Sequence, residues 1–83
     1  MSTEQSVSPE PRPDVLVRLM EMADRYHAAN ELRQAMEMYW EMVEKYEDTP
    51  QAQQARERLM EMAEHYERAG ERRQARGIYE RLV

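Results

Sequence analysis

The chain has 83 residues, of which 35% are charged, with a formal net charge of −5 and no cysteine. The lack of cysteine excludes disulfides, and the acidic balance argues against nucleic-acid binding, which needs a clustered excess of Lys and Arg. Because no apolar run approaches a signal peptide or the roughly 18 residues of a membrane span, we expect a soluble, cytoplasmic protein.

The first segment, residues 1–12, is polar and contains Pro9 and Pro11. A segment with so few apolar residues cannot bury enough surface to offset the entropy lost on ordering. We therefore expect a disordered N-terminal arm at residues 1–12.

The rest of the sequence is a tandem repeat. Residues 18–43, RLMEMADRYHAANELRQAMEMYWEMV, return as residues 58–83, RLMEMAEHYERAGERRQARGIYERLV, with 14 of the 26 aligned positions identical. A period between roughly 20 and 50 residues is typical of proteins in which each unit buries its apolar face against the next. We expect one domain at 13–83, with its first repeat at about 13–47 and its second at about 50–83.

The matched positions fall at helical spacing, and residues with high helix propensity dominate the chain. Asn30 and Gly70 stand at equivalent places between apolar stripes, and both tolerate the positive φ of a helix C-cap. Thr49 and Pro50 have the character of an N-cap and the first helical residue that follows it. These signals predict an all-α fold, a short α-solenoid of two helical hairpins, with four helices near 13–29, 31–47, 50–69 and 71–83.

The sequence resembles the tetratricopeptide repeat family over residues 16–83. Its period of 40 exceeds the family's usual period of about 34, and Arg72 stands where the family has an apolar or aromatic residue. The resemblance implies stacked helical hairpins that bind proteins. The family's recurring positions are matched in the first copy by Leu19, Met22, Ala23, Tyr26, Asn30, Leu32, Ala35, Tyr39, Met42 and Pro50, and in the second by Leu59, Met62, Ala63, Tyr66, Gly70, Ala75, Tyr79 and Leu82.

Members of this family often bind peptides on the concave face formed by the first helix of each pair. The resemblance places a set of acidic and apolar residues on that face, which disfavours a clamp for a C-terminal carboxylate. A basic or amphipathic helical segment of another protein suits such a surface better. The residues are Val17, Met20, Glu21, Asp24, Glu57, Met60, Glu61 and Glu64.

Apolar residues also gather at the start of the first predicted helix and at the end of the last one, where we expect no polar capping helix to cover them. We expect these faces to be buried by self-association or by docking on a larger protein. The residues concerned are Val15, Leu16, Ile78, Leu82 and Val83.

Trp40 interrupts the repeat, because its counterpart in the second copy is Glu80. Two interpretations are open: Trp40 contacts a partner from the flank of the second helix, or it covers the third helix of its own chain.

Metal sites and catalysis find no support in the sequence. Met-Glu-Met triplets begin at Met20, Met36 and Met60, but residues two apart on a helix point about 200° away from each other, so their sulfurs cannot chelate one ion. We expect one Met of each triplet in the core and the other against a neighbouring element or partner. His27 and His65 lie at unrelated places in the two copies and have no second ligand at metal spacing. We therefore expect no enzyme activity, no metal and no cofactor.

The leading hypothesis is a protein–protein interaction module, acting as a small scaffold, adaptor or accessory subunit. It either self-associates or docks on a larger protein. The alternative hypothesis is a regulatory helical protein that holds a small apolar ligand among Met20, Met36, Met60 and the tyrosines.

Overall fold

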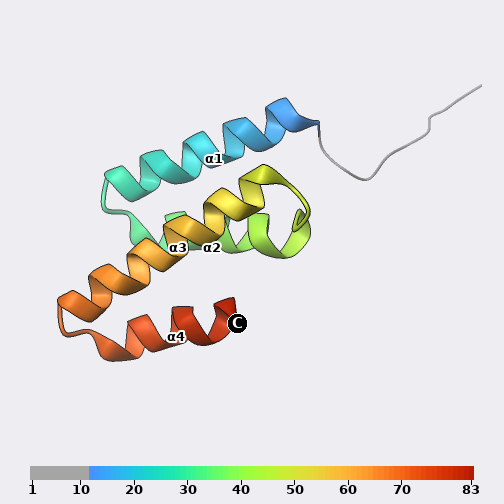
Figure 1. The fold of residues 1–83 in the computed structure, drawn as a ribbon. Coiled ribbons are helices and arrows are strands. Elements are labelled where there is room, and N and C mark those ends of the chain that lie inside the picture. The colour runs from blue at the N-terminus through green and yellow to red at the C-terminus, as the bar shows by residue number, and fades with distance from the viewer. Residues whose placement is uncertain (1–11) are drawn as a thin grey trace, which may run out of the picture.

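The computed structural model describes residues 12–83, and every regular element in this range is a helix. The predicted all-α fold is confirmed, and each predicted helix end lies within two residues of the observed one. The predicted arm lies outside the described residues except for Arg12. The helices are α1 (Pro13–Ala28), α2 (Leu32–Lys45), α3 (Pro50–Arg68) and α4 (Arg72–Leu82), and they form two consecutive hairpins (Figure 1).

The turn inside each hairpin depends on one residue with positive φ. Asn30 follows α1 with φ of 63° and Gly70 follows α3 with φ of 82°. This conformation lets the Glu31 N–H donate to the Tyr26 carbonyl at 2.9 Å, and the equivalent bond in the second hairpin measures 2.8 Å. Both helices thus end in the Schellman motif, which satisfies carbonyls that the helix itself leaves unpaired.

The start of α3 matches the sequence prediction. The Thr49 hydroxyl accepts from the Ala52 N–H at 3.1 Å, and Pro50 fills the first turn. The same hydroxyl donates to the Tyr46 carbonyl at 2.6 Å, which fixes the link from α2. This connection sets the second hairpin against the first.

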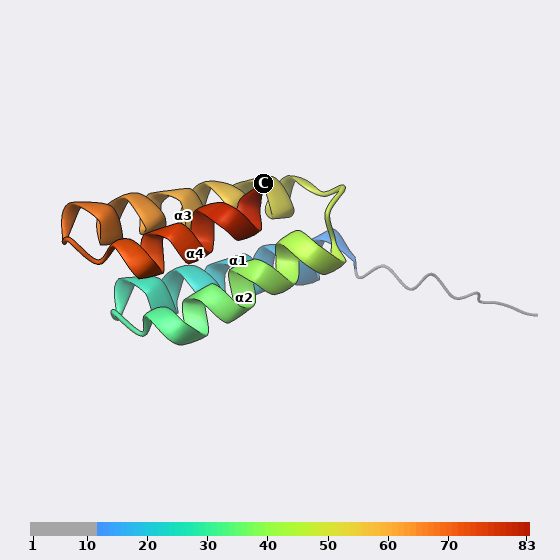
Figure 2. The same cartoon turned by 90° about the horizontal axis from the view of Figure 1, so that it is seen from below.

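The hairpins stack because α2 packs against both α1 and α3, while α4 packs against α3 (Figure 2). Small side chains allow the helices to approach closely: Ala35 is fully buried and Ala75 is 2% exposed. The main core consists of Leu16, Met20, Ala23, Ala35, Tyr39, Trp40, Met42, Ala55, Leu59, Met62, Ala63 and Ile78.

Two of the Met-Glu-Met triplets divide between core and surface as predicted, but in opposite ways. In α1, Met20 is 4% exposed and Met22 is 38% exposed; in α3, Met62 is 3% exposed and Met60 is 41% exposed. Met20 and Met60 are equivalent by the repeat, as are Met22 and Met62. Their environments differ because the first repeat has a neighbour after it, whereas the second has a neighbour before it.

Candidate interaction surfaces

An open groove of about 400 Å³ runs along α3 beside the end of α4. Its apolar centre is Met60, and half-buried Leu82 lines it from α4. Three carboxylates and one guanidinium surround these side chains. We call this surface the α3 groove; it is lined by Gln53, Arg56, Glu57, Met60, Glu61, Glu64 and Leu82.

The helical period explains why these side chains share one face. Successive groove residues on α3 are three positions apart or adjacent, so they follow one side of the helix. Glu57 precedes Met60 by one turn and Glu64 follows it by one turn. The thioether is therefore flanked along the helix by carboxylates, which favours an apolar ligand that also carries positive charge.

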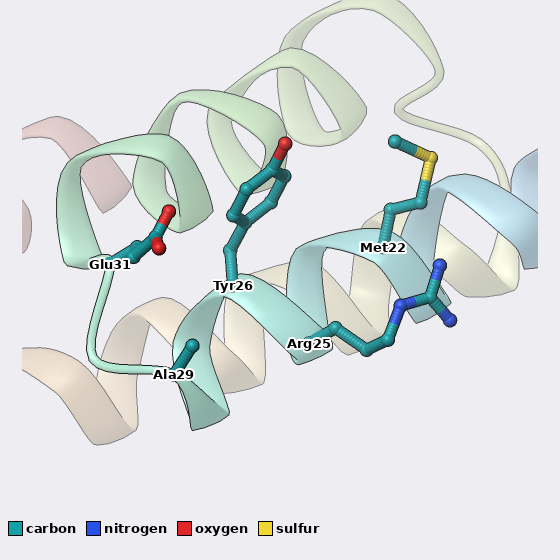
Figure 3. A pocket seen from close by; sticks show the side chains of 5 residues that line it. All are labelled: Met22, Arg25, Tyr26, Ala29 and Glu31. Carbon is teal, nitrogen blue, oxygen red and sulfur yellow. The ribbon is translucent and has the colours of Figure 1, made fainter.

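A second hollow, of about 340 Å³, lies at the C-terminal end of α1. The Met22 and Tyr26 side chains rise from the same side of α1, and Arg25 projects beside them (Figure 3). Glu31, just beyond the turn, and Ala29 complete the lining, so this surface combines apolar contact area with charges of both signs. We call it the α1 groove.

A partly exposed polar contact ties the first three helices together. Arg58 on α3 donates from Nε to the Asp24 carboxylate on α1 at 3.2 Å, and the Tyr39 hydroxyl of α2 donates to the same oxygen. Burial and this hydrogen bond to Asp24 raise the pKa of Tyr39 far above its ordinary value of 10.0. Burial alone would lower the pKa of Arg58, but the hydrogen bond to Asp24 and the attraction of its charge raise it overall.

Trp40 is largely buried, and what remains exposed of it lines an open hollow between α2 and the end of α4. Its side chain is 7% exposed, and the Arg81 guanidinium of α4 lies 4.3 Å from the ring centre. Arg81 also pairs with Glu44 at 2.7 Å. The interpretation of Trp40 as an exposed partner contact is therefore wrong. Its own chain covers the indole, and α4 contributes Arg81 to that cover.

The predicted concave-face residues divide between two environments. The four on α3, which are Glu57, Met60, Glu61 and Glu64, all line the α3 groove.

The four predicted residues on α1 lie elsewhere. Met20 is buried in the core and Asp24 is held by the ion pair to Arg58, because α3 packs over this side of α1. The prediction of Met20 as a partner contact is wrong for this reason. Val17 is 43% exposed and Glu21 is exposed, outside both grooves.

The prediction of exposed apolar residues at the two ends of the repeat region is wrong at two positions. Leu16 is 3% exposed and Ile78 is 4% exposed, because the helical period turns both side chains into the core. Val15 is 36% exposed and Val83 is fully exposed, and Leu82 contributes to the α3 groove.

Neither Arg58 nor the α1 groove was predicted, and no signal in the sequence identifies Arg58. For the α1 groove, the repeat aligns Met22 and Tyr26 with Met62 and Tyr66, but their burial depends on the neighbouring helices. A position that is buried in one copy and exposed in the other marks a surface that the fold leaves uncovered.

Two further features, a metal site and a membrane-spanning helix, are absent from the described residues. Within residues 12–83, no group of three His, Cys, Asp or Glu side chains is arranged to hold a metal ion. His27 places its ring near the Tyr39 ring in an edge-to-face arrangement, with 6.1 Å between the ring centres. None of α1 to α4 has the length and apolar character needed to cross a lipid bilayer.

Comparisons with models of protein families, with curated proteins and with solved structures found no match, so the functional argument rests on the residues of this chain.

Proposed function

We propose that this chain is a protein–protein interaction module of the tetratricopeptide type, which docks through its α3 groove as a scaffold, adaptor or accessory subunit. One observation carries the proposal. Met60 is 41% exposed at the centre of the groove, whereas Met20, at the same place in the first repeat, is 4% exposed under a packed neighbouring hairpin. The α3 groove of the second repeat therefore corresponds to the surface of the first repeat against which another pair of helices packs.

The composition of the groove defines the partner's chemistry. Met60 offers a flexible, polarizable contact that adapts to an apolar side chain of another protein. Glu57 and Glu64, one turn on either side, attract Lys or Arg at matching spacing. An amphipathic helix with an apolar stripe and basic flanks satisfies both requirements.

No observation in the structure specifically supports the alternative hypothesis of a small apolar ligand. It requires Met20, Met36 and Met60 to line one space, but Met20 is in the core and Met60 is in the open groove. The α3 groove also presents three carboxylates, which a purely apolar ligand leaves unpaired.

Photo-crosslinking in the cells that make the protein tests the proposal. A photoreactive phenylalanine analogue replaces Met60 in the α3 groove, and the control places it at exposed Arg33 on α2, outside both grooves. We expect residue 60, and not residue 33, to give a defined crosslink to a polypeptide, either another protein or a second copy of this chain. If residue 60 gives no polypeptide adduct beyond the Arg33 control, the proposal is wrong.

A further inference from the structure

The interface between the two repeats provides a template for their outer faces. Met20 is buried where the first repeat meets the second, and its counterpart Met60 is exposed in the α3 groove. In the other direction, Met62 is buried where the second repeat meets the first, and its counterpart Met22 is exposed in the α1 groove. Each outer face thus carries the methionine that the internal interface buries.

The polar part of the internal interface is duplicated in the same way. Arg58 of α3 pairs with Asp24 of α1 across the interface at 3.2 Å. The shift of 40 carries Asp24 onto Glu64 in the α3 groove and Arg58 onto Arg18 on α1. Glu64 and Arg18 are both exposed, and within residues 12–83 neither takes part in an ion pair. One face therefore holds the acidic half of the contact and the other holds the basic half.

The tyrosine of the internal contact is duplicated as well. Tyr39 donates to Asp24, and its counterpart Tyr79 is half-buried on α4 and donates to Glu67 at 3.0 Å. The second repeat thus keeps the tyrosine and the carboxylate of the contact, although Tyr79 donates to Glu67 and not to Glu64. No guanidinium of the described residues pairs with Glu64 as Arg58 pairs with Asp24.

The charges of the two faces are complementary beyond this single pair. The α3 groove carries three carboxylates and one guanidinium, whereas Arg18 and Arg25 lie on the side of α1 that also carries Met22 and Tyr26. Arg18 and Met22 are four residues apart, so they share a helix face. This side of α1 combines two large apolar side chains with two guanidinium groups and the Glu31 carboxylate, and its guanidinium groups complement the carboxylates of the α3 groove.

From this complementarity we infer that the occupant of the α3 groove is the α1 face of a second copy of this chain, with Arg18 of one copy paired to Glu64 of the next. The inference rests on the proposed function and names its partner. The contact is heterologous: each copy uses its α3 groove toward one neighbour and its α1 face toward another. Repetition of such a contact gives an open chain of copies, or a ring where the rotation closes.

Two substitutions make the contact between copies weaker than the contact within the chain. Buried Leu16 has Arg56 as its counterpart, and buried Trp40 has Glu80. The outer faces consequently bury less apolar surface and depend more on charge. We expect association that rises with concentration and falls with added salt.

Charge reversal, followed by sedimentation velocity from low micromolar to millimolar concentration, tests the inference. Glu64→Arg and Arg18→Glu each place like charges opposite one another, so each variant alone is expected to weaken association by about tenfold or more. A mixture of the two variants restores opposite charges when the two kinds of chain alternate. At one contact the two substituted positions then face each other, and at the next the unchanged Glu64 faces the unchanged Arg18. We expect the mixture to associate like the wild-type chain.

The matched control pair is Glu47→Arg and Arg33→Glu, which reverse exposed charges outside both grooves. Circular dichroism of all variants verifies that their helix content is unchanged, since none of the four side chains is buried. Controls that associate like the wild type, together with rescue in the mixture, support the inference.

Three results would overturn it. These are a wild-type chain that stays monomeric across the whole range, reversal variants that associate normally, and a mixture that fails to recover. If one of them occurs while residue 60 still crosslinks to a different polypeptide, the interaction module stands and its partner is another protein. If residue 60 gives no polypeptide adduct, both proposals fail.

Discussion

The Arg81 guanidinium lies 4.3 Å from the centre of the Trp40 ring and also donates to the Glu44 carboxylate at 2.7 and 3.1 Å. This contact joins α4 to α2, although the two helices belong to different hairpins. It also covers the indole, which is only 7% exposed. The last helix is therefore attached both to its own hairpin partner and to the preceding repeat.

We predict that Arg81→Ala lowers the free energy of unfolding by about 1 kcal/mol, the scale of an exposed cation–π contact together with a half-exposed ion pair. In a domain of this size, that change lowers Tm by roughly 4–8 °C. Trp40 is the only tryptophan, so its fluorescence reports the same change: the emission maximum moves to longer wavelength as the indole gains water.

Arg73→Ala is the matched control, because Arg73 is exposed on the same helix and, within residues 12–83, forms no ion pair. Equal stability of the two variants in chemical denaturation would show that the contact of Arg81 with Trp40 and Glu44 does not stabilise the stack.

Tyr39 gives the fold a dependence on alkaline pH. Burial and the hydrogen bond to Asp24 raise its pKa in the folded protein, whereas the unfolded chain keeps the ordinary value of 10.0. A group whose pKa is raised by folding contributes stability that is fully present below the unfolded pKa and is lost as pH rises through the folded one. We therefore expect the free energy of unfolding to fall as pH increases above about 10.

We predict that Tyr39→Phe is less stable than the wild type by about 1 kcal/mol near neutral pH, because Asp24 loses one donor. Above about pH 10 this difference shrinks, since the wild type alone has a buried phenol to ionise at this position. Denaturation at a series of pH values measures both effects. Tyr46→Phe, which leaves the contact with Asp24 intact, serves as the control, and a pH slope that is the same for all three proteins would contradict the prediction.

The helix ends could be predicted because their causes are local. Asn30 and Gly70 are residues that accept positive φ, and Thr49 with Pro50 forms a cap within four residues, so each signal is contained in a short segment. Helical spacing of apolar residues likewise required no knowledge of the neighbouring helix. For these reasons the four helices and their hairpin turns follow from the sequence.

The placement of the candidate site depends on which helix lies against which face, and that information is not local. Met20 and Met60 stand in the same sequence, RLMEM, yet one is in the core and the other lines the α3 groove. Trp40 presented the same difficulty, because the Arg81 guanidinium that lies over its ring is 41 residues later in the chain. Only the packing of the second repeat on the first separates these cases.

We predict that Asn30→Ala destabilises the first hairpin turn by about 1 kcal/mol, because a residue with a Cβ and no local hydrogen-bonding group pays that cost at a φ of 63°. Asn30→Gly is the matched control and is expected to keep wild-type stability within a few tenths of a kcal/mol. Urea denaturation compares the two variants directly. Equal stability of the Asn30→Ala and Asn30→Gly variants would contradict a positive φ at this position.

The close approach of α3 and α4 makes Ala75 the sharpest test of the hairpin arrangement. Its side chain is 2% exposed, so Ala75→Leu forces extra methylenes into a packed contact and costs about 1–3 kcal/mol. A core of this size supplies only about 3–5 kcal/mol in total, so we expect the cooperative unfolding transition to be largely lost. Gln74→Leu adds a leucine to the exposed neighbouring position and is expected to keep that transition. Far-UV circular dichroism during thermal unfolding compares the two variants. If both proved equally helical and cooperative, that result would show that α4 does not pack on α3 through Ala75, and that Leu82 does not line the α3 groove as described.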